Sequence, residues 1–314
     1  MDRIATNSTY NSLLINLMQA EIAQTTAGSQ LSSTEKATDL KGYGTGAEAL
    51  TAMQATSTQV AGFLSNAQTV SAKLATQDSA LNEVASSAGD VIQNITQALA
   101  TGNGTGLMQS LQNAFSSAIE GLNTTFNGEY LFAGGQVHTP PTSAATLSDL
   151  TSAPSIASLF HNDQRQISTQ IDANTTISTG FLADQVGTPL FTALQAIEAY
   201  DQGPNGPFNG PLTTAQQAFL TQQLAGLKTV QSNLNVVVGQ NGLAQNEVTN
   251  AQNDLGQRQT MLQGLIGNQT QADLAKASTD LQQAQLAIAA SGKVFQALNQ
   301  SSLLNTLQSS PQIA

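Results

Sequence analysis

The residues that could perform acid–base, nucleophilic or metal chemistry are few in this sequence. It has no cysteine, which excludes disulfides, thiolate metal sites and a cysteine nucleophile. The only two histidines are His138, beside a Pro-Pro pair, and His161, in a polar segment. Their spacing matches no H-E-x-x-H or Cys/His zinc motif. Both histidines are therefore interpreted as polar surface residues.

Carboxylates and glycines give no stronger signal for chemistry. Acid–base catalysis needs paired carboxylates in a pocket that perturbs their pKa values, whereas Asp78, Glu83 and Asp90 stand singly, as on a solvated helix face. The glycine-rich run 102–106 lacks the lysine of a Walker motif and does not follow a strand, so it favours a flexible connector. The sequence thus predicts no catalytic residue, no cofactor and no metal site, and the chain is not expected to be an enzyme.

The composition restricts the partners that the chain can bind. Only 9% of the 314 residues are charged, against about 25% in typical globular domains, and the net charge is −11. The nine basic residues are scattered singly, while nucleic acids and anionic membrane surfaces require clusters of Lys and Arg. There is no signal-peptide-like apolar run near Met1 and no apolar stretch of spanning length. Neither nucleic-acid binding nor membrane insertion is expected.

The strongest pattern in the sequence is apolar residues repeated every seven positions. Between Ala47 and Ala100 there is no proline. One apolar series repeats every seven residues, and a second series, which includes Phe63, Val70 and the polar Gln77, follows it three positions later along the chain. This pattern is typical of a long helix in a coiled-coil-like bundle. The first series consists of Met53, Val60, Ala67, Leu74, Leu81, Ala88 and Ile95.

The second half of the chain repeats this pattern. A polar residue at a seam position, as Asn241 is, can fix the register of a helix pair at some cost in stability. The phase breaks near Gly264 and Gly267, after which a new stripe predicts a last helix that ends at about Leu307. The seam series consists of Leu220, Leu227, Leu234, Asn241, Val248, Leu255 and Leu262, and the new stripe contains Leu274, Leu281, Ile288, Phe295 and Leu298.

Two shorter helices and one hairpin complete the prediction. Tyr10, Leu13 and Leu17 share one helical face, and apolar spacing predicts another helix over 107–123. Seven of the eight prolines lie between Gly134 and Pro211. There the partly alternating runs 165–172 and 175–178, around an Asp-Ala-Asn turn, predict a β-hairpin.

We therefore predict a mainly α fold in which long antiparallel N- and C-terminal helices form a coiled-coil-like rod with a small β-containing central domain. The expected regions are an N-terminal helix and loop (1–46), the two halves of the rod (47–133 and 213–266), the middle domain (134–212) and a C-terminal helix (267–314).

Neither terminal segment can bury its apolar stripe alone, so each needs the other or a neighbouring subunit. Short helices are marginal alone and exposed apolar patches mark interaction sites, so we expect the outermost stripes to form the subunit-assembly interface. The expected interface residues are Leu13, Leu17, Ile288, Phe295 and Leu298. The expected intramolecular helical core is Met53, Val60, Leu74, Leu81, Leu227, Leu234, Val248 and Leu255.

One segment of the sequence carries a specific family resemblance. Residues 125–134 resemble the N-G-x-Y-L-F-A-G segment of the flagellin family, in particular of its hook–filament junction group (hook-associated protein 3). The matching residues are Asn127, Gly128, Tyr130, Leu131, Phe132 and Gly134. Near the N-terminus, residues 3–6 (R-I-A-T) resemble the R-I-S-T start of that group, and residues 30–33 (Q-L-S-S) resemble the Q-L-S-S of the flagellin N-terminal signature. Residues 34–43 depart from the family continuation G-x-R-I-N-x-x-x-D-D.

The resemblance implies a structural subunit of the bacterial flagellum that joins hook to filament by axial assembly through its terminal helices. A filament flagellin is the alternative within the family, and a secreted type III effector or translocon-like coiled-coil protein is the alternative from another class. The implied partners are hook-associated and flagellin subunits, further copies of itself and a flagellar export chaperone. The implied location is the extracellular flagellum, reached without a cleaved signal peptide.

Overall fold

The two long heptad patterns form the two longest helices of the structure, a computed structural model that describes residues 2–308. Helix α2 spans Ala47–Thr101 and helix α6 spans Thr214–Thr270. The chain divides into two compact units. Unit 1 comprises the residues up to 59 and from 259 onward, and unit 2 comprises residues 60–258. The borders of the two units therefore fall inside α2 and α6.

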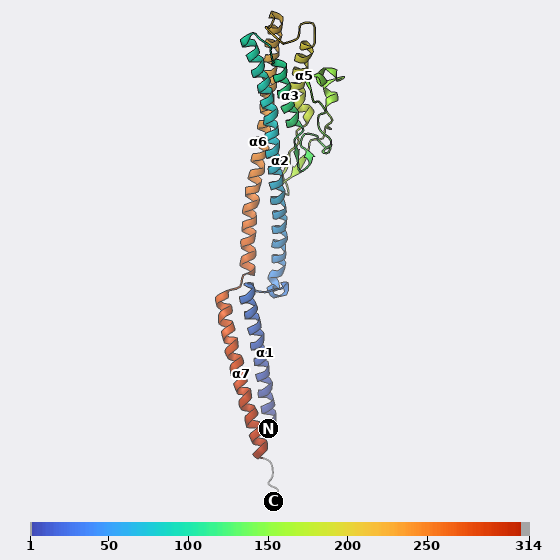
Figure 1. The fold of residues 1–314 in the computed structure, drawn as a ribbon. Coiled ribbons are helices and arrows are strands. Elements are labelled where there is room, and N and C mark those ends of the chain that lie inside the picture. The colour runs from blue at the N-terminus through green and yellow to red at the C-terminus, as the bar shows by residue number, and fades with distance from the viewer. Residues whose placement is uncertain (1, 309–314) are drawn as a thin grey trace. The chain divides into compact units, whose positions relative to one another are not determined.

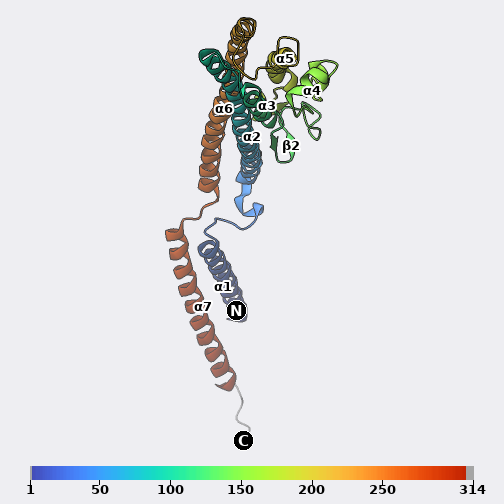
Figure 2. The same ribbon diagram turned by 45° about the horizontal axis from the view of Figure 1, so that its top comes forward.

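Unit 2 is built on the antiparallel pair of α2 and α6, on which shorter elements pack. Figures 1 and 2 show α3 beside α2, with α4 and α5 gathered on the same side. The shorter elements are helices α3 (Leu107–Leu122), α4 (Leu147–Ser152), η2 (Ile156–Leu159) and α5 (Ala183–Asp201), and strands β1 (Thr125–Phe126), β2 (Glu129–Tyr130), β3 (Ser168–Gln170) and β4 (Thr176–Ser178). Strands β1–β2 and β3–β4 form two separate antiparallel hairpins. The mainly α fold with a small β part is confirmed.

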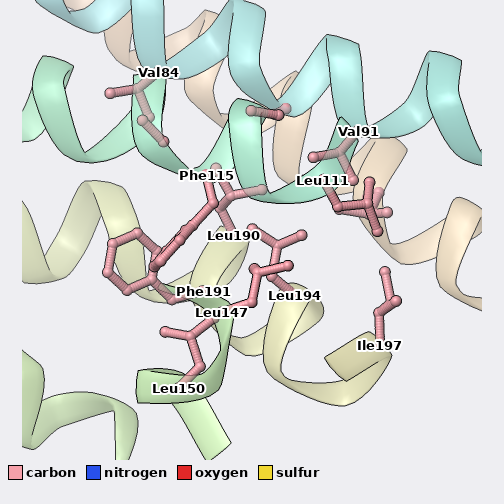
Figure 3. Close-up of a cluster of buried hydrophobic side chains, with 14 of the residues drawn as sticks. Val84, Val91, Leu111, Phe115, Leu147, Leu150, Leu190, Phe191, Leu194 and Ile197 are labelled. Atoms are coloured by element: carbon pink, nitrogen blue, oxygen red, sulfur yellow. The ribbon is translucent and has the colours of Figure 1, made fainter. Parts of the chain in front are cut away.

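The main core of unit 2 lies where α2, α3, α4 and α5 meet (Figure 3). Phe115 of α3 packs edge-on against Phe191 of α5 at 4.9 Å between ring centroids, and Phe160 stacks on the same ring at 5.1 Å. Helix α3 approaches α2 closely at Gly121, where a Cβ would lie 2.9 Å from the Ala80 carbonyl oxygen. A larger residue there would force the two helices apart.

Helix α5 is the longest element that was not predicted from the sequence. Prolines marked this region as irregular, because an interior proline removes a helix hydrogen bond and costs roughly 3 kcal/mol. Pro189 nevertheless lies inside α5. The same helix buries Leu190, Phe191, Leu194 and Ile197 completely. Burial of four large side chains at roughly 1.5–3 kcal/mol each outweighs the cost of the proline.

Unit 1 contains an antiparallel helix pair and its connections. Helix α1 spans Asp2–Ser33 and helix α7 spans Leu274–Gln308, with a short 3-10 helix, η1 (Leu40–Gly46), between α1 and α2. The connections that leave α1 and enter α7 are joined by two backbone hydrogen bonds. The Lys36 amide donates to the Thr270 carbonyl at 2.7 Å, and the Ala272 amide donates to the Thr34 carbonyl at 3.0 Å. This bridge fixes where the α1–α7 pair begins.

Candidate assembly surface

The seam between α1 and α7 is closed by alanines. Ala20 and Ala27 of α1 and Ala277 and Ala284 of α7 are buried. Side chains this small let the helices approach closely but bury little apolar area per contact. Further along the pair, the rings of Tyr10 and Phe295 lie 5.4 Å apart. The two helices therefore pack against each other along a narrow contact surface.

Several of the larger apolar residues of α1 lie outside this seam. Leu14, Ile15, Met18 and Ile22, here called the outer row, are 49–64% exposed. Their spacing places them on one helical face. Two packed helices can bury only the sides that meet, so the described residues of unit 1 leave the outer row uncovered. Leu286 of α7, at 71% exposed, adds to the apolar surface of the same unit.

An open groove runs along the same helix pair. It has a volume of about 730 Å³ and is lined by Ala20, Ala23, Ala27, Ala277, Ala284 and Ala287, with Asp273, Lys276 and Asp280 among its polar residues. The ammonium of Lys276 donates to Asp280 at 2.6 Å, and this contact raises the pKa of Lys276. A second, apolar pocket of about 250 Å³ is lined by Leu13, Leu14, Leu17 and Phe295, among others. Unit 1 thus combines protruding apolar side chains with a groove, here called the alanine groove, that has small walls.

The residues that the sequence analysis expected at the interface lie on the seam side of the pair. Leu13, Leu17, Ile288 and Leu298 are half-buried, and Phe295 is 41% exposed. The outer row was not predicted, because the apolar stripe of this helix was traced through only one residue in each helical turn. The double apolar positions Leu13-Leu14-Ile15 and Leu17-Met18 were the available signal, since they make the apolar stripe wider than a single seam needs.

The expected core residues of the long helices are buried, with one exception. Val60, Leu74, Leu81, Leu227, Leu234, Val248 and Leu255 are all buried, whereas Met53 is half-buried. The two polar seam residues meet each other. Gln77 Nε2 donates to Asn241 Oδ1 at 3.0 Å, and Asn241 Nδ2 donates to the Leu74 carbonyl at 3.1 Å. Both side chains have no exposed surface.

The Asn127–Gly134 motif forms the first hairpin and its exit. Asn127 and Gly128 have φ values of 53° and 82°, which suits the two-residue turn that matches strand twist. Leu131 and Phe132 behind it are buried, and the Phe132 carbonyl accepts the first amide of α5 at 3.0 Å. The motif thus joins α3 to the start of α5.

The turn residue Gly128 gives a stability test. A Cβ at Gly128 would contact nothing within 4 Å, so Gly128→Val acts only through the left-handed backbone, at roughly 1–2 kcal/mol. We expect its melting temperature to fall by roughly 2–8 °C. Gly210→Val is the control, because Gly210 also has open space but no positive φ. Equal melting temperatures of the two variants in thermal circular dichroism would contradict this role of the turn.

The exit of the motif is held by a carboxylate. Asp163 Oδ1 accepts the amides of Gly135 at 2.8 Å and Arg165 at 2.9 Å, and these bonds lower the pKa of Asp163. A Cβ at Gly134, whose φ is 65°, would collide with the Asp163 side chain. Glycine and aspartate here have an architectural role.

The histidines do not form a chemical site with acidic groups. His161 Nε2 lies 2.9 Å from Ser143 Oγ, and both histidines are exposed. Within residues 2–308, no three His, Asp or Glu side chains form a group that could hold a metal ion.

No helix in this described part of the chain is both long and apolar enough to cross a bilayer.

Comparison with known proteins finds a family match. The family model described as "Bacterial flagellin N-terminal helical region" matches residues 4–137, which contain α1, α2, α3 and the first hairpin. Residues 4–137 thus match the helical N-terminal region of flagellins. This match supports a structural role in the bacterial flagellum. A search of curated proteins finds no match.

Solved structures share the fold of this chain. A protein of Vibrio parahaemolyticus described as a flagellar hook-associated protein has a TM-score of 0.59 at 14% identity, over 72% of this chain and 97% of that chain. FlgL of Bacillus cereus has a TM-score of 0.51 at 14% identity, over 68% of this chain and 96% of that one. At this identity the likeness concerns the arrangement of helices and not individual contact residues.

Proposed function

We propose that this chain joins the hook to the filament and assembles axially through the α1–α7 pair. The observation that carries the proposal is the exposed outer row beside the alanine groove in unit 1. Large side chains that protrude next to a groove with small walls can pack into the groove of another copy or of a related subunit. Two different surfaces that fit each other generate an open array instead of a closed dimer.

The charge distribution supports assembly through unit 1. Unit 1 carries seven acidic and five basic residues, whereas unit 2 carries thirteen acidic and four basic ones. Identical subunits that meet through a nearly neutral surface avoid like-charge repulsion. Unit 2 has a net charge of −9, so repulsion should keep the unit 2 regions of neighbouring copies apart.

The proposed partners are hook-associated and flagellin subunits, other copies of this chain and, before assembly, an export chaperone. A chaperone that covers the apolar residues of α7 would prevent premature self-association during export. We include export without a cleaved signal peptide and an extracellular location on the flagellum in the proposal. The likeness to the flagellar hook-associated protein of Vibrio parahaemolyticus favours the junction over other positions in the flagellum.

Deleting the gene in its native cell and imaging the surface tests the position. We expect intact hooks that carry no filament, together with loss of swimming, because a missing junction leaves the filament nowhere to attach. Complementation with the wild-type gene is the control. Normal flagella in the deletion strain would contradict any essential role, and loss of the hooks would contradict the junction.

A filament flagellin is the second candidate, since the matched region is that of flagellins. Copy number separates the two proposals. Quantitative mass spectrometry of sheared flagella should find a small number of copies per flagellum for a junction protein and thousands for a filament subunit.

A further inference from the structure

The β3–β4 hairpin is braced by its own turn. The Ile171 amide donates to the Thr175 carbonyl at 2.9 Å, and Gln170 Nε2 donates to the Ala173 carbonyl at 2.9 Å. The Asp172 carboxylate accepts the Ala173 amide at 2.7 Å. These bonds define the conformation of the turn.

The tip of this hairpin is bonded to both long helices of unit 2. Asn66 of α2 donates from Nδ2 to the Gln170 carbonyl at 2.6 Å. Arg258 of α6 donates from Nη1 to Asp172 Oδ2 at 3.2 Å. Ile171 lies between these two anchors and has no exposed surface. Since a two-stranded hairpin has no interior, Ile171 must be enclosed by the helices to which its neighbours are bonded.

The hairpin covers a part of the helix pair that the main core does not reach. In the main core, the first buried residue of α2 is Ala80 and the last buried residue of α6 is Leu234. Val60, Val70 and Leu255 are buried but lie outside that cluster. We call residues 60–74 and 245–258 the strapped segment.

We infer that the β3–β4 hairpin is a strap that clamps α2 to α6 over the strapped segment and sets its local stability separately from the main core. With the hairpin docked, the segment has a third layer and a buried isoleucine. With the hairpin undocked, the segment is two helices with one side open to water, and its hydrogen bonds open more often. The central insert thereby controls the stiffness of the helix pair beside it.

Hydrogen exchange of the full-length protein, followed by mass spectrometry, tests the strap. Ile171→Ala should accelerate amide exchange in the strapped segment about tenfold or more, because it removes the buried anchor. Exchange in the main core, for example over 111–122 and 190–197, should not change. Thr176→Ala is the matched control, because Thr176 is exposed on the same hairpin.

A second variant keeps the test decisive if Ile171→Ala does not fold. Asn66→Ala combined with Arg258→Ala removes only the two anchors on the helix surfaces, and it should give a smaller acceleration confined to the same segment. The strap is refuted if exchange accelerates in the hairpin alone while the strapped segment keeps its wild-type rate. It is equally refuted if the main core accelerates to the same extent.

Discussion

Replacing Leu14, Ile15, Met18 and Ile22 together with glutamine is expected to abolish incorporation into the flagellum. These side chains are about half exposed or more in the isolated chain, and glutamine is a good helix former, so α1 should keep its helix. If a neighbour buries the remaining apolar area, the four changes remove roughly 3–6 kcal/mol of association free energy. That is roughly a hundredfold or greater loss of affinity at each contact.

The measurement is complementation of the deletion strain, with circular dichroism and light scattering of the purified variant. We expect wild-type helix content, no swimming and no self-association. The matched control replaces Val236 and Leu243, two exposed apolar residues of α6 in unit 2, with glutamine. Assembly by the outer-row variant at the wild-type level, or equal failure of the control, would show that contacts lie elsewhere.

The second large effect is expected at the polar pair inside the α2–α6 seam. Asn241→Ala leaves the buried Gln77 amide without its acceptor, and Gln77 Oε1 already has no partner among the described residues. The lost hydrogen bonds and the small cavity should together lower the free energy of unfolding by roughly 2–4 kcal/mol. Replacing both Gln77 and Asn241 with leucine removes the unpaired groups, so this double variant should be close to the wild type in stability.

Denaturant unfolding of the wild type, of both single leucine variants and of the double variant measures the coupling. A favourable coupling of roughly 1 kcal/mol or more is expected between residues that share one buried bond. Additive effects would mean that the two amides do not depend on each other. The leucine pair should also permit sliding of the two helices, because it removes the bond that selects one register.

The sequence predicted the long helices and their seams because period-seven patterns depend only on residue type. It also marked Gln77 and Asn241 as polar seam positions. It could not show that they meet, since these two residues are 164 positions apart in the sequence and their pairing depends on the antiparallel offset between the two helices. Helix α5 was missed because local propensity around Pro189 was outweighed by burial against α3 and α4, which only the tertiary structure reveals.

The surface residues were predicted less well than the seams. The expected interface residues lie on the seam side of the α1–α7 pair. The exposure of the outer row can be inferred only from the structure, which shows that α1 packs against a single helix and leaves its other face uncovered. The strap contacts were beyond sequence reasoning, because Asn66 and Arg258 are isolated polar residues on otherwise solvated faces.

The bridge between the connections 34–36 and 270–272 determines when unit 1 can form. Lys36 Nζ also donates to the Asn268 carbonyl, across 232 residues of sequence. Because the ribosome releases the N-terminal end first, α1 has no α7 to pair with until most of the chain has been made. An incomplete chain therefore exposes the apolar face of α1 without its partner helix. The risk of aggregation lasts until the C-terminal part of the chain is available.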